Sequence, residues 1–297
     1  MNSNESALSK PATACARLMA HELIFSAYLA LTLARLLLTP SSQASDCGVF
    51  AAMIIGIAAA VYWHWHQPGQ FTFRLRLLVF FVAMNLAFMC METAVPAITP
   101  GKADALLRNL DIQLIGETPS ILMQSWVRPW LTELMSACYQ LFFPYLVIGV
   151  FSYAFREAKI ARSAFTGLFS LYGLGFLGYT LMPALGPHLA FATDFSTQLN
   201  GGAITAYNAN LVKEFSTGVD VFPSLHVAVS SYFLLIDRRY MPLRFRILLL
   251  PCLGLWFSTF YLRYHYLVDM LAGFALAGFG YWMARLEESR NDLRIKL

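Results

Sequence analysis

Residues 246–284 read RILLLPCLGLWFSTFYLRYHYLVDMLAGFALAGFGYWMA, two apolar runs that are separated only by a short turn around Arg263. The runs 246–261 and 265–284 approach the ~20 residues that a helix needs to cross the hydrocarbon core of a bilayer. In lipid, a helix lets each run satisfy its own backbone hydrogen bonds. The stretch therefore predicts two neighbouring antiparallel membrane helices.

The composition of the whole chain points the same way. Its 297 residues are 58% hydrophobic and only 13% charged, and the mean hydropathy is +0.56. Soluble domains carry about 25% charged residues. A disordered chain is excluded as well, because disorder requires high charge and few aromatics, and 15% of this chain is aromatic. We therefore expect an all-α, polytopic membrane bundle.

Eight apolar stretches are expected to cross the membrane: roughly 20–38, 48–65, 75–95, 134–154, 164–183, 222–237, 246–261 and 265–284. Most of the 21 lysines and arginines fall in the segments on one side, which the positive-inside rule makes cytoplasmic. That side holds Lys10, Arg17, Arg74, Arg76, Arg156, Lys159, Arg162, Arg238, Arg239, Arg244, Arg246, Arg285, Arg290, Arg294 and Lys296, whereas the other holds Lys102, Arg108, Arg128, Lys213 and Arg263. This pattern predicts that both termini are cytoplasmic, and it attributes the net charge of +4 to topology and not to nucleic-acid binding.

The first stretch also has features of a signal peptide, because Ser42-Gln43-Ala44 offers the small residues of a cleavage site. Arg35 lies inside its apolar part, which favours a retained helix. Cleavage would leave the orientation of the other seven stretches unchanged.

Two segments on the non-cytoplasmic side are long. In 97–133, a leucine-rich face and a charged face alternate at helical spacing; the first comprises Ala103, Leu106, Leu107, Leu110 and Leu114, and the second Asp104, Arg108 and Asp111. This spacing predicts an amphipathic helix in the outer interface, which acts either as a lid or as a lipid-entry surface. The segment 184–221 is polar. The chain has no internal repeat, so the inverted-repeat pattern of many transporters finds no support.

His265 and Asp269 are four residues apart and therefore share one face of a helix. A carboxylate one turn from an imidazole can bind one ring nitrogen and leave the other free as a base or nucleophile. Pro223-Ser224-Leu225-His226 suits the first turn of the sixth helix, because proline is favoured at a helix start. The N–H groups of such a turn attract anions such as phosphate.

The expected topology brings Ser224, His226, Arg263, His265 and Asp269 to one depth on the outer side. Two histidines, a carboxylate and a guanidinium suit phosphoryl transfer without a metal. His265 would attack phosphorus, Asp269 would orient it and His226 would protonate the leaving oxygen, while Arg263 and helix N–H groups would hold the phosphoryl oxygens. The structural alternatives are a plain His–Asp pair, an interfacial His226 and a snorkelling Arg263.

Phe-Pro-Ser-Leu-His at 222–226 and Ser-Thr-Phe-Tyr-Leu-Arg-Tyr-His-Tyr-Leu-Val-Asp at 258–269 resemble the second and third motifs of the type 2 phosphatidic acid phosphatase superfamily. The sequence Tyr-Leu-Arg-Tyr-His-Tyr is similar to the corresponding motif of its inositol phosphorylceramide synthase branch. The resemblance covers roughly residues 75–285. It implies a phosphohistidine mechanism with His265 as nucleophile, Asp269 as its partner and His226 as acid and base.

The chain also departs from the phosphatase pattern. That branch has a first motif with a lysine and an Arg-Pro pair, and an arginine directly after the serine of the third motif. Here Thr259 follows Ser258, and Met182-Pro-Ala-Leu-Gly-Pro-His188 stands at the expected place of the first motif. This favours the synthase-like branch, and it leaves His188 either as a phosphate ligand or as a loop residue.

The remaining candidates carry weaker signals. The five cysteines, Cys15, Cys47, Cys90, Cys138 and Cys252, are scattered, with Cys90–Cys138 as the pair to test for a bridge. Trp63-His64-Trp65-His66 is typical of an aromatic belt at the membrane border and not of a metal site. Glu92 and Glu133 approach the outer face, where they either line a lipid cleft or form structural pairs.

These observations predict an accessory hairpin at residues 1–70 and a catalytic membrane domain at 71–297. The expected function is transfer or hydrolysis at lipid phosphate esters, with head-group transfer of the inositol phosphorylceramide synthase type favoured. The alternatives are a polyprenyl-diphosphate or phosphatidate phosphatase and a non-catalytic lipid transporter or scaffold. Membrane lipids are the expected partners, with no cofactor and no metal. The site would face the periplasm of a bacterial inner membrane or the lumen of a Golgi-type membrane.

Overall fold

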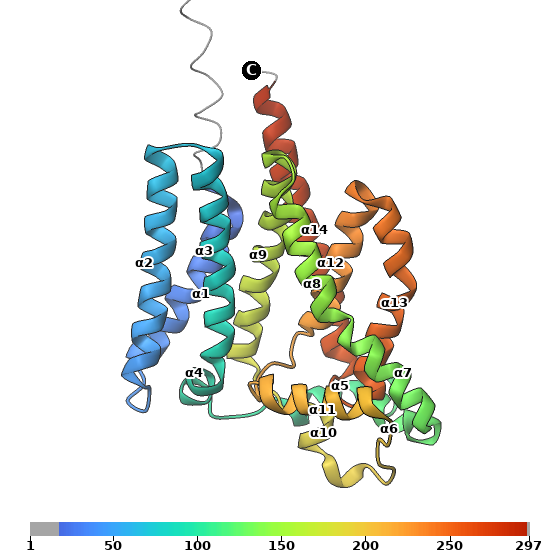
Figure 1. Cartoon of the computed structure of the whole chain (residues 1–297). Helices are drawn as coiled ribbons and strands as arrows, with labels where there is room; N and C mark the ends of the chain where they lie inside the picture. Colours follow the sequence, from blue (N-terminus) through green and yellow to red (C-terminus); the bar gives the residue numbers. More distant parts are fainter. Residues whose placement is uncertain (1–17, 296–297) are drawn as a thin grey trace, which may run out of the picture.

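The computed structural model describes residues 18–295, with side chains for residues 18–290. Every regular element in this range is helical, so the all-α prediction is confirmed (Figure 1). The helices are α1 (Ala20–Leu37), α2 (Ala44–His66), α3 (Gln70–Met89), α4 (Met91–Ile98), α5 (Asp104–Ile115), α6 (Pro119–Leu122), η1 (Met123–Trp126), α7 (Pro129–Gln140), α8 (Phe142–Ala154), α9 (Ala158–Leu181), α10 (Pro187–Ala190), η2 (Ala192–Asp194), α11 (Ala203–Phe215), α12 (Leu225–Tyr240), α13 (Pro242–Tyr261) and α14 (Leu267–Ile295).

Helix α9 is the centre of the bundle, and it packs against α1, α3, α8, α12 and α14 (Figure 1). Close contact is possible because Gly167 has no side chain. A Cβ at this position would lie 2.4 Å from the carbonyl oxygen of Gly280 and 2.4 Å from the hydroxyl of Tyr232. Glycine is therefore required where α9 meets α12 and α14, the two helices that carry the site residues.

Within the described residues, seven helical segments are long and apolar enough to cross a membrane: Ala20–Leu37, Ala44–His66, Gln70–Met89, Pro129–Ala154, Ala158–Leu181, Pro242–Tyr261 and Leu267–Arg290. The remaining stretch of the sequence prediction, 222–237, becomes α12. Its 16 residues extend only about 24 Å, and 11 of them are buried. Helix α12 packs against α9, α13 and α14.

The span Pro129–Ala154 is broken at Leu141 into α7 and α8. Pro144 explains the break, because it has no N–H for the carbonyl of Gln140 and its ring crowds that carbonyl. The N–H of Leu141 bonds instead to the carbonyl of Cys138, three residues back, at 3.2 Å. The break turns Tyr139 and Gln140 toward the interior of the bundle, where both line a cavity.

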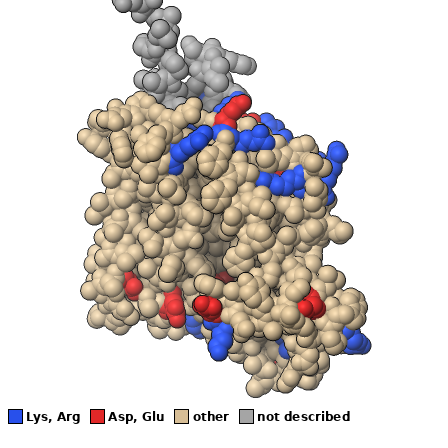
Figure 2. All heavy atoms as spheres, in the orientation of Figure 1, with Lys and Arg blue, Asp and Glu red and all other residues tan. Residues whose placement is uncertain are grey.

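Basic residues gather at the end of the molecule where α14 ends (Figure 2). This is the arrangement that the alternating charges of the connecting segments predict. Buried ion pairs join the helices there: Arg76 with Glu22, Arg162 with Glu287 at 2.9 Å, and Arg244 with Asp237 at 2.5 Å. Lys10, Arg17 and Lys296, assigned to this side from the sequence, lie outside the described residues, as does the side chain of Arg294.

The opposite end of the bundle is covered by the short helices α5, α10 and α11 (Figure 1). The amphipathic helix predicted in 97–133 is α5, and the face that points into the protein carries Asp104, Leu107 and Asp111. Asp104 and Asp111 are 5% and 0% exposed, whereas Leu106 and Leu114 of the predicted apolar face are 51% and 56% exposed. The reason is that both carboxylates bind backbone N–H groups of neighbouring segments.

The structure contradicts a Cys90–Cys138 bridge. Both residues are free thiols, as are Cys47 and Cys252. Cys15 lies outside the described residues. The four described cysteines are partly or fully buried, which fits the alternative that they pack as small apolar side chains.

Candidate active site

His265 lies in the turn between α13 and α14, one helical turn before Asp269. Its Nδ1 is 3.1 Å from Oδ2 of Asp269, and the backbone N–H of Tyr266 donates to the same oxygen at 3.1 Å. His265 and Asp269 are only 2% and 0% exposed. When Nδ1–H donates to the carboxylate, the neutral ring leaves Nε2 unprotonated and available as a base or nucleophile.

Ser224 is the N-cap of α12 and fixes the start of this helix beside His265. Its Oγ accepts a hydrogen bond from the N–H of Val227 at 3.5 Å and lies 3.4 Å from Nε2 of His265. The N–H of Ser224 donates to the carbonyl of Asp269 at 3.0 Å. The positive end of the α12 dipole is thereby held next to the His265 ring, where it favours a negatively charged group.

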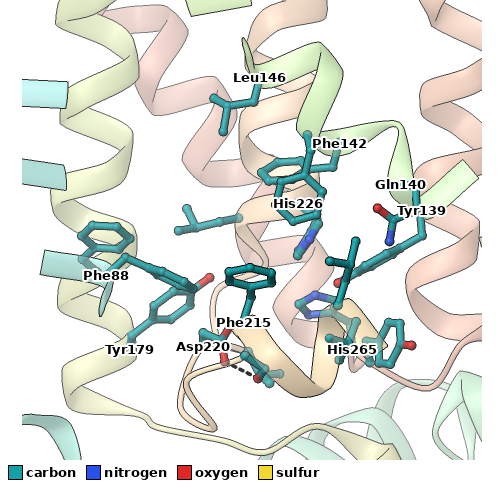
Figure 3. Close-up of a pocket in the computed structure, with 18 of the residues that line it drawn as sticks. Phe88, Tyr139, Gln140, Phe142, Leu146, Tyr179, Phe215, Asp220, His226 and His265 are labelled. Carbon is teal, nitrogen blue, oxygen red and sulfur yellow. Dashed lines mark hydrogen bonds between the residues drawn. The ribbon is translucent and has the colours of Figure 1, made fainter. Parts of the chain in front are cut away.

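His226 and His265 face the same cavity, with ring centroids 5.6 Å apart (Figure 3). His226 stacks on Tyr139 at 4.6 Å and packs against Phe142 at 4.4 Å, which fixes the plane of its ring. No hydrogen bond from the described residues reaches its ring nitrogens. Both nitrogens are therefore available to a substrate.

The cavity has a volume of about 200 Å³ and lies among α3, α7, α8, α9, α11 and α12 (Figure 3). Its walls are mainly apolar and aromatic, and include Phe88, Phe142, Leu146, Tyr179 and Phe215. The two histidines are among its few polar groups. A phosphate ester with an apolar tail suits this combination, because a few polar groups fix orientation and the apolar walls bind the rest.

His188 also lines the cavity, at the start of the loop after α9. Its N–H donates to the carbonyl of Arg263 at 2.9 Å, and its ring packs edge-on against Tyr264. The approach of the two segments requires Gly186, which has a φ of +84° and whose Cβ would lie 2.5 Å from the carbonyl oxygen of Tyr264. Burial lowers the pKa of His188 to about 4, so its ring is neutral at pH 7.

Arg263 is two residues before His265 in the sequence but is not among the residues that line the cavity. Its guanidinium donates to the carbonyl of Thr197 at 2.5 Å and lies over the ring of Phe195, 4.1 Å from the centroid. Its backbone has a φ of +68°, a left-handed conformation that is uncommon for residues other than glycine. The structure thus places the Arg263 side chain on the 195–197 loop and not beside His265.

Two carboxylates of α5, whose role the sequence analysis missed, hold the backbone around the site. Asp111 accepts hydrogen bonds from the N–H groups of Leu267 and Val268, at 3.0 and 3.1 Å. Asp104 accepts from Gly186 N–H and from the hydroxyl of Tyr266, both at 2.9 Å. Their spacing of seven residues was the available signal, since it puts both on one helix face.

Asp220 and several tyrosines are further cavity residues that the sequence analysis missed. Asp220 precedes the Phe222–His226 motif by two positions, and its Oδ1 accepts a hydrogen bond from Ser216 at 3.0 Å. Tyr264 joins α11 to the site, because its hydroxyl accepts from Asn208 at 3.0 Å. No sequence pattern distinguishes these residues from ordinary loop and helix residues.

The weaker sequence candidates have structural contacts. Glu133 caps the start of α11, where it accepts from the N–H groups of Gly202, Ile204 and Thr205 at 2.7–3.0 Å. His64 contacts the hydroxyl of Thr72, and His66 the carbonyl of Tyr62. Among the described residues, no group of three or more His, Cys, Asp or Glu side chains could hold a metal ion.

Comparison with known proteins gives one match. The model of the PAP2 superfamily matches residues 106–283, more than half of the chain, and this segment contains α12, the turn at His265 and the α14 residue Asp269. No curated protein and no solved structure matches the chain. The length of the family match, together with the helical membrane fold, shows that the chain belongs to the PAP2 superfamily of membrane phosphatases and phosphotransferases.

Proposed function

We propose that this protein is a lipid phosphotransferase that moves a phospho-head-group between lipids through a phosphohistidine, as enzymes of the inositol phosphorylceramide synthase type do. The observation that carries the proposal is the Asp269–His265 pair, which faces His226 across a 5.6 Å separation of ring centroids in a mainly apolar cavity. A lipid phosphate diester has the polar centre and the apolar tails that such a cavity suits.

In the proposed first step, Nε2 of His265 attacks phosphorus while the bond from phosphorus to the leaving oxygen breaks. His226 gives its proton to that oxygen, and Asp269 stabilises the positive charge that develops on His265. In the second step, His226 takes the proton of an acceptor hydroxyl, whose oxygen attacks phosphorus as the bond to Nε2 breaks. When water replaces the acceptor alcohol, the same two steps amount to hydrolysis.

Ser224, His188 and Arg263 are the proposed phosphate-binding residues. Ser224 is 3.4 Å from Nε2 of His265, and His188 lines the same cavity, so both are supported by position. Arg263 would have to leave Thr197 and Phe195 to reach the phosphate, and its role therefore requires that the 195–197 loop moves when substrate binds.

We also propose that residues 1–70 form an accessory hairpin and residues 71–297 the catalytic membrane domain. In this proposal the termini are cytoplasmic and the site faces the outer side, in the periplasm or a Golgi-type lumen. The gathering of basic residues at the end of the bundle opposite α5 and α11 supports this orientation (Figure 2).

The decisive experiment incubates the purified protein with head-group-labelled phospholipid diesters, with and without a long-chain alcohol acceptor, and follows the products by lipid mass spectrometry. We expect label on the acceptor, an acid-labile phosphoryl group on His265, and turnover that survives chelation by EDTA. Transfer that proceeds without a phosphohistidine, or turnover that depends on added magnesium, would contradict the mechanism. Release of phosphate from monoesters alone would favour a phosphatidate phosphatase.

A further inference from the structure

Asp220 places a carboxylate in the wall of the cavity that also holds His188, His226 and His265 (Figure 3). Its Oδ1 accepts a hydrogen bond from the hydroxyl of Ser216 at 3.0 Å. No hydrogen bond from the described part of the chain reaches Oδ2. The proposed chemistry gives Asp220 no part in bond making or breaking, so its negative charge needs another explanation.

Asp220 has no lysine or arginine partner at ion-pair distance among the described residues. No lysine or arginine lines the cavity, and Asp220 forms no ion pair with a described residue. Lys102 interacts with Asp220 electrostatically, but its Nζ donates to the carbonyl of Gly218 at 2.6 Å outside the cavity lining. His188 adds no charge at pH 7, because burial lowers its pKa to about 4.

A carboxylate in the cavity wall acts differently on the two classes of lipid phosphate. A phosphate monoester has a second pKa of about 6 and carries nearly two negative charges at neutral pH, whereas a diester carries one. Repulsion between the carboxylate and a phosphate in the same cavity is stronger for the doubly charged monoester than for the singly charged diester. In a diester, an uncharged ester group stands in place of the second charged oxygen, so this group is not repelled by the carboxylate.

We propose that Asp220 is a specificity-determining residue that excludes phosphate monoesters from the cavity and admits singly charged phosphodiesters. The proposal rests on the function proposed above and deepens it, because it assigns the choice between a diester donor and a phosphatidate-type monoester to one side chain. Asp220 acts on binding and not on the chemical steps.

The test compares two short-chain lipids that differ only in the phosphate: phosphatidate, a monoester, and phosphatidylethanol, a diester with an uncharged head group. Dissociation constants for the full chain in detergent are measured at about pH 8, where the monoester is doubly charged. We expect the wild type to bind the diester at least tenfold more tightly. Asp220→Asn should shift the ratio of the two constants about tenfold toward the monoester, which corresponds to ~1.4 kcal/mol.

Two further variants make the test specific. Asp220→Glu keeps the charge and should keep the preference for the diester. Glu214→Gln removes one negative charge from the exposed part of α11, outside the cavity lining, and should leave the ratio within twofold of wild type. Since Asn can still accept from Ser216, the loop contact is preserved in Asp220→Asn, and thermal unfolding of each variant verifies the fold.

The proposal is overturned if Asp220→Asn leaves the ratio within twofold of wild type, or if Glu214→Gln shifts the ratio as much as Asp220→Asn does. All dissociation constants are measured in a His265→Ala background, which lacks the proposed nucleophile, so the result does not depend on catalysis. A wild-type protein that shows the binding preference but no transfer and no phosphohistidine would contradict the proposed function and leave the role of Asp220 standing.

Discussion

At the scale of single residues, the site depends on which imidazole nitrogen is free. Asp269 engages Nδ1 of His265, whereas the ring nitrogens of His226 have no hydrogen bond from the described residues. The two histidines therefore differ in environment although both face one cavity. Nucleophile and acid are assigned from this difference, and substitutions separate the two roles.

His265→Ala removes the proposed nucleophile, so turnover is expected to fall to background with every substrate. His226→Ala removes only the proton donor, and an activated aryl phosphate, whose leaving group needs little protonation, should still be cleaved. The measurement compares a natural lipid with an aryl phosphate for both variants. Rescue of His265→Ala but not of His226→Ala by the activated substrate would interchange the two assignments.

Asp269→Asn keeps the shape of the side chain but presents a neutral amide to Nδ1 of His265. The corresponding change in the serine-protease triad costs about 10⁴ in rate, because the imidazole adopts the wrong tautomer. By that analogy we expect kcat to fall by roughly 10²–10⁴ while thermal stability changes little. Loss of folding without a separate loss of kcat would indicate that the pair is structural.

His188 gives a pH-dependent prediction for stability. Its pKa is lowered to about 4 in the folded chain, whereas the unfolded value is about 6.5. As the pH falls from 6.5 to 4, the unfolded chain binds a proton that the folded chain does not, so stability decreases across this window by at most about 3 kcal/mol. His188→Gln should remove this decrease in denaturant titrations, and the exposed His66→Gln is the control. Parallel pH profiles for wild type and His188→Gln would refute the expectation.

At the scale of helices, α5 fixes the backbone around the candidate active site through hydrogen bonds to its two aspartates. Asp111 accepts hydrogen bonds from the first N–H groups of α14, which lie two to three residues after His265. Its carboxylate therefore occupies the place at this helix N-terminus where an anion would otherwise bind. Asp104 holds Gly186 and Tyr266 on the two segments that meet at His188. The start of α12 is therefore the terminus at which the proposed phosphate site would lie.

Asp111→Ala would leave two buried N–H groups without a partner, at a cost of about 1–3 kcal/mol for each. We expect a lower melting temperature and a fall in kcat that is larger than any change in KM, because the start of α14 positions His265. Asp111→Asn keeps one oxygen acceptor and should be intermediate. Gln113→Ala, on the exposed side of the same helix, should have no effect. A change confined to KM would argue against a positioning role.

Much of the helical architecture was predictable from the sequence, and the features that were not predictable have physical reasons. Apolar runs and helical spacing predicted the long helices, and the four-residue spacing of His265 and Asp269 predicted their contact. Hydropathy alone did not predict that Asp104 and Asp111 of α5 are buried beside Leu107, because carboxylates are buried where backbone N–H groups are present to bind them. The side-chain direction of Arg263 and the contribution of Asp220 depend on loop packing, which leaves no periodic signal.

At the scale of the whole molecule, one end of the bundle carries the basic residues and the other carries the site and the short helices that cover it (Figures 1 and 2). The basic residues and the candidate site therefore lie at opposite ends of the bundle. The cavity is lined by residues of α3, α8 and α11, among other helices. If the basic end is cytoplasmic, as proposed above, the candidate site belongs to the opposite side of the membrane.

The orientation predicts different accessibility for the two ends. In a variant whose native cysteines are replaced by alanine, Glu214→Cys on α11 should react with a membrane-impermeant maleimide in sealed cells or vesicles of known orientation. Arg238→Cys, at an exposed position near the end of α12 and outside the candidate spans, should react only after permeabilisation. Both positions lie on the surface, so a difference in labelling reports sidedness and not burial. Reversed accessibility would place the active site on the cytoplasmic side, and it would mean that the basic end of the bundle does not follow the positive-inside rule.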